Sequence, residues 1–81
     1  MKALLDTHVW LWYLLADKRL SKAQLKFIEG QSNELWLSSI SVWEAHLLIE
    51  RDRISVAEAP SRWISRGLEI LPVKQAPLTF A

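Results

Sequence analysis

The sequence predicts a single α/β domain built around a parallel sheet. Short apolar runs alternate along the chain with longer segments of helical pattern, and polar capping residues separate them. Strands that alternate with helices in this way form parallel sheets with helices packed on them. With 81 residues the chain is long enough for one small domain. A chain of this length buries only about 60–65% of its unfolded surface, so the core is expected to be thin.

The first predicted strand ends at a pair of polar residues. Residues 3–5 form an apolar run that stops at Asp6 and Thr7, which is typical of a buried parallel strand. Either Asp6 or Thr7 can cap the helix predicted over residues 8–16. That helix is apolar on nearly every side, so we expect it to be central to the fold or shared with a partner chain.

A second helix and a second strand follow. The helix is predicted over residues 21–30, with a serine as its cap and Gly30 in the left-handed conformation that often ends a helix. Residues 34–38 are predicted to form the second strand. Ser39 or Ser41 is then expected to start a third helix.

The last third of the chain predicts one more helix and one more strand. After the third helix, which reaches about residue 51, a proline begins a fourth helix over residues 61–67. Residues 68–73 are the candidate for a third strand, and Pro72 places the end of that strand near residue 71. The sheet is therefore expected to be truncated after its third strand.

Composition excludes several classes of protein. Hydrophobic residues make up 51% and charged residues 23%, which is too apolar for a disordered chain and too charged for a membrane protein. The longest apolar stretch, residues 8–16, falls far short of the about 20 residues that span a membrane. No secretory signal is expected, and the absence of cysteine excludes disulfides and favours a cytoplasmic protein. The net charge of +1 does not indicate a general polyanion binder.

Two acidic residues stand in unusual places. Asp6 follows an apolar strand directly, and ligand sites of open parallel sheets lie at the carboxyl ends of the strands. The alternative is that Asp6 only caps the next helix. Glu44 shares a helical face with the apolar residues Ile40 and Leu48, where an unpaired carboxylate is costly. The alternative for Glu44 is a salt bridge to Arg51 or a place at the rim.

The two acids are expected to meet, because each follows a strand and parallel strands end at the same edge of the sheet. Two carboxylates brought together repel each other, and a divalent cation removes that conflict. Oxygen ligands without cysteine favour Mg²⁺ or Mn²⁺ over Zn²⁺. Asp6 and Glu44 are therefore the candidate metal ligands and catalytic residues.

The same residues carry a resemblance to a known family. The segment Leu-Leu-Asp-Thr-His-Val-Trp over residues 4–10 resembles the opening motif of the PIN domain. The segment Ser-Ser-Ile-Ser-Val-Trp-Glu over residues 38–44 resembles the second motif, at the spacing typical of VapC-type toxin ribonucleases. Arg53-Ile54 and residues 71–73 also fit, so the resemblance covers residues 1–81 as one partial domain.

The resemblance implies a fold, a reaction and partners. The fold is an α/β/α sandwich around a parallel sheet, with three or four acids that bind Mg²⁺ or Mn²⁺. Toxin members of the family hydrolyse RNA, are usually homodimers, and are blocked by a cognate antitoxin protein. Asp6 and Glu44 correspond to the first two metal ligands, and the hydroxyl of Thr7 is expected to assist. The remaining acids of the family lie in a motif downstream of the point where this chain ends. Asp52 stands where many relatives have glycine.

Other polar and aromatic residues have plainer interpretations. Trp10, Trp12, Trp36 and Trp43 are expected in the core, and Trp63 is a candidate for an interface or for contact with substrate. The two histidines, His8 and His46, are expected to be structural or on the surface, because a metal-bound water can serve in place of a histidine base. The alternative is a zinc site of histidines and acids, although no zinc-binding spacing accompanies them. Six cations could face phosphate but are expected mainly on solvated helix faces: Lys22, Lys26, Arg51, Arg53, Arg62 and Arg66.

Three functional hypotheses follow. The first is a Mg²⁺- or Mn²⁺-dependent endoribonuclease of the toxin–antitoxin type. The second is a catalytically dead remnant of such an enzyme that acts as a dimerisation or antitoxin-binding module through its apolar surfaces. The third is an α/β interaction module whose likeness to the family is accidental.

Overall fold

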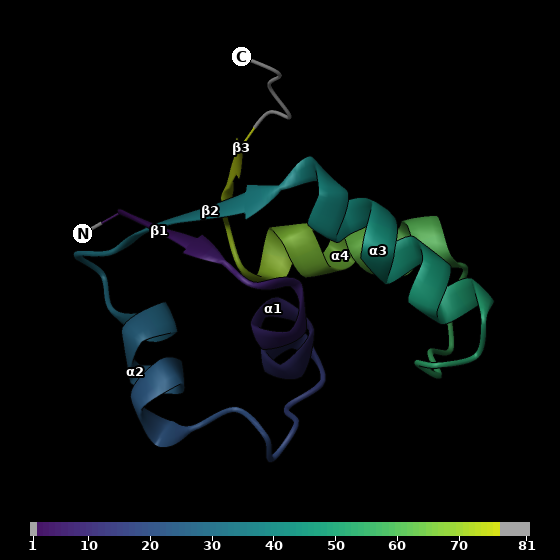
Figure 1. Cartoon of the computed structure of the whole chain (residues 1–81), viewed down its shortest axis with the longest axis horizontal. Coiled ribbons are helices and arrows are strands. Elements are labelled where there is room, and N and C mark those ends of the chain that lie inside the picture. Colours follow the sequence, from purple (N-terminus) through teal and green to yellow (C-terminus); the bar gives the residue numbers. More distant parts are fainter. Residues whose placement is uncertain (1, 77–81) are drawn as a thin grey trace.

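Residues 2–76 form a three-stranded parallel sheet with four helices, as the alternating pattern predicts (Figure 1). The computed structural model describes residues 2–76. The strands are β1 (Lys2–Leu5), β2 (Glu34–Ser38) and β3 (Lys74–Ala76), and the helices are α1 (Thr7–Leu14), α2 (Lys22–Glu29), α3 (Ser39–Glu50) and α4 (Pro60–Ile70). The strand order is β1-β2-β3, and both pairs are parallel. The predicted α/β class with a parallel sheet is confirmed.

The third strand lies later than predicted. Residues 68–70, expected to be extended, are the last turn of α4, and the strand is Lys74–Ala76. The apolar residues of α4 recur at helical spacing, and Ile64, Gly67 and Leu71 are buried. A short apolar run at the end of such a helix resembles a strand in sequence, because periodicity alone does not separate the two.

The end of α2 also differs from its prediction. Gly30 has φ −69° and ψ 129°, which is an extended conformation that any residue adopts, so the expected left-handed glycine is wrong. A Cβ atom at Gly30 would lie 2.8 Å from Nδ2 of Asn33. That amide group donates to the carbonyl oxygen of Phe27 at 2.9 Å. Gly30 therefore makes room for a side chain that caps the last turn of the helix.

The helix starts follow local capping chemistry. The carboxylate of Asp6 caps α1 by accepting from the backbone N–H of His8 at 2.8 Å, as one interpretation of the sequence expected. The third helix begins at Ser39, one of the two predicted starting residues. Its cap is Ser38, whose hydroxyl oxygen accepts from the N–H of Ile40 at 3.1 Å, so the capping role expected of Ser39 or Ser41 is wrong. Because Ser38 is also the last residue of β2, strand and helix join without a loop.

Two helices end in left-handed residues that are not glycine. Ala16, after α1, has φ 52°, and Asp52, after α3, has φ 56°. At each end the next N–H bonds back over a full turn, from Asp17 to the carbonyl oxygen of Trp12 and from Arg53 to that of Leu48, both at 2.9 Å. This is the Schellman ending, which favours glycine at the left-handed position. It accounts for an aspartate at position 52, since Asp tolerates that conformation better than most residues.

Replacement of Ala16 by glycine is expected to stabilise the fold by about 1 kcal/mol, because the left-handed conformation is strained for alanine and not for glycine. The same change at Ala23, exposed inside α2, serves as the control. It is expected to destabilise the protein by about 0.5–1 kcal/mol. Urea unfolding of both variants measures the two effects. A loss of stability in the Ala16 variant would contradict the claim that the backbone at Ala16 is strained.

One face of the sheet carries the core. Leu5 of β1 lies in register with Leu37 of β2, and both are buried in one cluster with residues from all four helices. The next register position, Leu4 beside Trp36, is on the opposite face of the sheet. There Leu4 is 64% exposed. The helices therefore cover the Leu37 face, and within residues 2–76 none of them is long and apolar enough to cross a membrane.

Candidate active site

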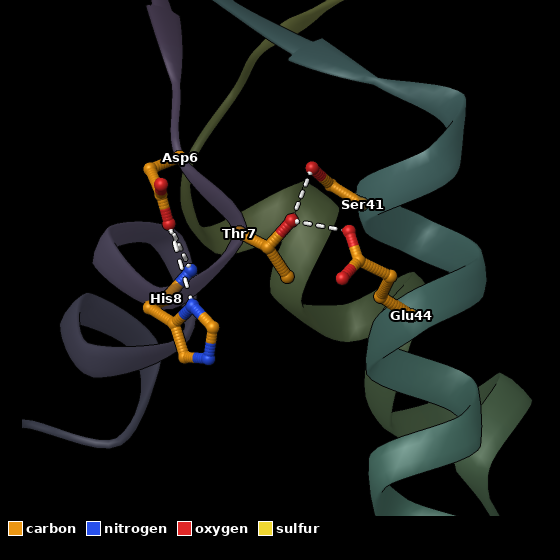
Figure 2. A network of polar contacts seen from close by, with 5 residues as sticks. All are labelled: Asp6, Thr7, His8, Ser41 and Glu44. Carbon is orange, nitrogen blue, oxygen red and sulfur yellow. Dashed lines mark hydrogen bonds and ion pairs between the residues drawn. The ribbon is translucent and has the colours of Figure 1, made fainter.

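The candidate acids lie where β1 and β2 give way to helices. The pairing of Leu5 with Leu37 makes the two strands end at the same level, so α1 and α3 begin side by side at one edge of the sheet (Figure 2). Asp6 caps α1, and Glu44 lies in the second turn of α3. Polar side chains from two segments far apart in sequence are thereby brought to one place.

A chain of hydrogen bonds joins α1 to α3 at this edge. The hydroxyl of Thr7 donates to Oε1 of Glu44 at 3.1 Å, and its oxygen lies 2.6 Å from Oγ of Ser41. Because the only proton of the Thr7 hydroxyl goes to Glu44, Ser41 donates to Thr7. Thr7 and Ser41 are 8% and 4% exposed, so this chain is shielded from water. Buried hydrogen bonds in series strengthen each other, which holds the Glu44 carboxylate in a defined orientation.

Asp6 is bound in a different way. Its Oδ1 atom accepts from the backbone N–H of His8, and Nδ1 of the His8 ring lies 3.5 Å from the same oxygen. The side chain is 68% exposed, and Oδ2 has no hydrogen-bond partner within residues 2–76. Capping occupies one carboxylate oxygen and leaves the other open to solvent, so the helix-cap role and a ligand role are compatible.

The two carboxylates do not touch each other. Thr7 lies between them, with Asp6 turned toward His8 and Glu44 turned toward Thr7 (Figure 2). Glu44 is half-buried, and within residues 2–76 it forms no salt bridge to Arg51, which was the alternative expectation. No group of three or more residues of the kind that hold a metal is gathered in this part of the chain. The described residues thus present two carboxylates at this edge.

Ser41 is a site residue that the sequence did not single out. It was expected only as a helix cap, yet its hydroxyl completes the contact between the helices. Its position three residues before Glu44 places both on one helical face, and that spacing is the signal that could have found it.

Trp43 was expected in the core and is 62% exposed, so that prediction is wrong. It lines a cavity of about 250 Å³ together with Glu44, His8 and Arg51. Trp10 is fully buried, as expected, whereas Trp12, Trp36 and Trp63 are half-buried. The indole of Trp43 therefore lies open beside the candidate acids.

Thr7→Val is expected to destabilise the protein by about 1–3 kcal/mol, because the buried hydroxyl of Ser41 would lose its partner. Thr7→Ser keeps the hydroxyl and is expected to restore most of that loss. Urea unfolding measures the stability of both variants. A Val variant as stable as the parent would show that the Ser41–Thr7–Glu44 chain contributes nothing.

Comparison with known proteins identifies the family of this chain. The family model described as PIN domain matches residues 3–79. The chain is 36% identical over 66 residues to a protein named Ribonuclease VapC22 from Mycobacterium tuberculosis (strain ATCC 25618 / H37Rv), a match that covers 82% of this chain and 50% of that relative. The chain thus spans about half the length of this curated relative. No solved structure matches significantly. Since the family pattern extends over nearly all of its residues, the chain belongs to the PIN domain family.

Proposed function

We propose that this chain carries part of the active site of a Mg²⁺- or Mn²⁺-dependent endoribonuclease of the toxin–antitoxin type. The observation that carries the proposal is the placement of Glu44 beside the Asp6–Thr7 pair at the carboxyl edge of a PIN-domain sheet. The relative that matches over most of this chain is named a ribonuclease, which supports RNA as the substrate.

The donor atoms at the edge suit a hard divalent cation. They are carboxylate and hydroxyl oxygens, and the sequence contains no cysteine that would favour zinc. Mg²⁺ commonly binds proteins through one or two carboxylates, with water and substrate phosphates as its other ligands. Oδ2 of Asp6 and Oε2 of Glu44 accept no hydrogen bond within residues 2–76, so each offers an oxygen. Asp6 and Glu44 would therefore hold the ion.

Each side chain at this edge then has a defined role in holding the cation and its ligands. When bound, the cation supplies positive charge for the phosphate oxygens and activates water for in-line attack. Thr7 keeps the carboxylate of Glu44 turned toward the edge by donating to it, and Ser41 in turn orients Thr7. The cap bond from the N–H of His8 holds the Asp6 side chain at the start of α1. The whole protein is proposed to be cytoplasmic, to act as a homodimer and to be inhibited by an antitoxin.

The test compares RNA cleavage with Mg²⁺, with Mn²⁺ and with EDTA, for this chain and for any longer protein that contains it. Binding of Mn²⁺, followed by the loss of the free-ion electron paramagnetic resonance signal, is measured in parallel. We expect RNA cleavage to require the metal, and we expect the protein to bind Mn²⁺. Cleavage that persists in EDTA, or protein that neither binds Mn²⁺ nor cuts RNA, would contradict the proposal.

A second candidate is a catalytically dead module that dimerises or binds an antitoxin. It is favoured by exposed apolar side chains on α3, where Ile40 is 41% and Trp43 62% exposed. This candidate predicts a stable oligomer in sedimentation measurements, with no metal-stimulated cleavage.

A further inference from the structure

A second cavity, of about 550 Å³, opens between α1 and the end of α3. Its polar lining consists of His8, Arg19, Arg51 and Arg53, and no acidic residue lines it. It shares His8, Leu48 and Arg51 with the cavity that contains Glu44 and Trp43. The two cavities therefore lie next to each other, and together they are called the groove: Glu44 lines one end of it and the arginines line the other.

Two of the three arginines are not neutralised. Arg19 donates through Nε and Nη2 to the carboxylate of Asp17, at 3.1 and 2.8 Å, and these bonds lower the pKa of Asp17 to about 2. Its guanidinium also lies 5.3 Å from the ring centroid of Trp12. By contrast, neither Arg51 nor Arg53 takes part in any of the ion pairs found within residues 2–76. The arginine end of the groove therefore carries uncompensated positive charge.

The hydrogen-bonded turn at the end of α3 fixes the backbone positions of Arg51 and Arg53. Arg51 is the C-cap of α3, and the N–H of Arg53 bonds to the carbonyl oxygen of Leu48. The left-handed residue Asp52 closes this ending between them. Because the turn is hydrogen-bonded, both side chains start from fixed positions at the wall of the groove, which reduces the entropy lost when they bind an anion.

We propose that the arginine end of the groove binds the phosphodiester backbone of single-stranded RNA next to the scissile phosphate, with Arg51 and Arg53 as phosphate ligands. The proposal rests on the proposed ribonuclease function. A strand whose phosphate reaches Glu44 can continue past His8 and Arg51 to Arg53, because His8 and Arg51 line both cavities. Guanidinium groups bind phosphate bidentately. The exposed indole of Trp43 offers a stacking face for an unpaired base at the other end.

The test uses fluorescence anisotropy with a labelled single-stranded RNA in a buffer that contains EDTA, because the proposed enzyme cleaves only with a bound divalent cation. Binding is measured over a series of KCl concentrations for the parent chain and for the Arg51→Gln/Arg53→Gln variant. Loss of two charge-assisted contacts is expected to raise the Kd about tenfold or more. The slope of log K against log salt is expected to fall by about 1.4, because each phosphate contact on a single strand contributes about 0.7.

The matched control removes the same charge elsewhere. Lys22→Gln/Lys26→Gln lies on α2, outside both cavities, and is expected to change the Kd and the slope little. An equal effect of this control would show that only net charge matters and would overturn the proposal. So would RNA binding that is absent in the parent chain or unchanged in the arginine variant. Binding of a glutamate-rich peptide is measured as a further probe. If the arginine variant loses binding of this peptide but keeps binding of RNA, the groove is a site for a protein partner and the proposal is wrong.

The outcome separates this proposal from the proposed function. If the arginine variant binds and cuts RNA normally while substitution of Glu44 abolishes cleavage, the phosphate subsite is wrong and the ribonuclease stands. If the arginine variant no longer binds RNA while substitution of Glu44 has no effect on cleavage, the proposed metal site is wrong. Thermal unfolding of the arginine variant and of the lysine control is expected to match that of the parent chain, because all four substituted side chains are exposed.

Discussion

Glu44→Gln is expected to lower metal-stimulated RNA cleavage by about 100-fold or more, which corresponds to about 2.7 kcal/mol of transition-state stabilisation. Glutamine has the same shape and keeps an oxygen that can accept from Thr7, so the contact between α1 and α3 can persist. What it lacks is the negative charge that a divalent cation requires. The variant therefore separates metal binding from folding.

The measurement compares initial rates of cleavage and Mn²⁺ affinity with those of the parent protein. Glu69→Gln, exposed on α4, is the matched control and is expected to leave both unchanged. Asp6→Asn provides an independent check, since asparagine caps a helix as well as aspartate does and removes only the charge. Unchanged cleavage and Mn²⁺ binding in both the Gln and the Asn variants would end the metal-site proposal.

Leu37→Ala is expected to destabilise the protein by about 2–5 kcal/mol. Leu37 is fully buried in the central strand and belongs to the cluster that unites the sheet with all four helices. Truncation leaves a cavity in a core that is small to begin with, and a domain of this size has a total stability of only about 4–12 kcal/mol. A large part of the population is therefore expected to unfold at moderate urea concentration.

Urea unfolding followed by tryptophan fluorescence measures this loss. The control is Leu4→Ala in the neighbouring strand, because Leu4 is 64% exposed and its truncation removes little buried surface. Its effect is expected to stay below about 1 kcal/mol. Similar losses at the two positions would contradict the assignment of the core to the Leu37 face of the sheet.

The elements with strong local signals were predicted well from sequence. The second strand was placed at residues 34–38, and β2 has these bounds. Ser21 was predicted to cap the second helix, and it forms a capping box with Gln24. These features depend on neighbours within a few residues, so the printed sequence contains the information that decides them.

Elements whose conformation depends on distant contacts were predicted less well. Residues 68–70 were predicted to be extended, yet they continue α4, because Gly67 and Leu71 are buried against the rest of the protein. A Cβ atom at Gly67 would lie 2.6 Å from a methyl carbon of Leu14, so α1 and α4 approach closely at this point. That approach is a property of the packed molecule and leaves no pattern in the local sequence.

The sequence by itself determined the parallel α/β class, and it singled out Asp6 and Glu44 as acids placed after strands. Only the tertiary structure decided that Glu44 contacts Thr7, 37 residues away, and that Ser41 joins them. It also decided that the cavity lined by Arg51 and Arg53 lies next to the one at Glu44 and shares His8 and Arg51 with it. The physical reason is that helical periodicity assigns a side chain to a face of its own helix, whereas its partner depends on how α1 and α3 pack together.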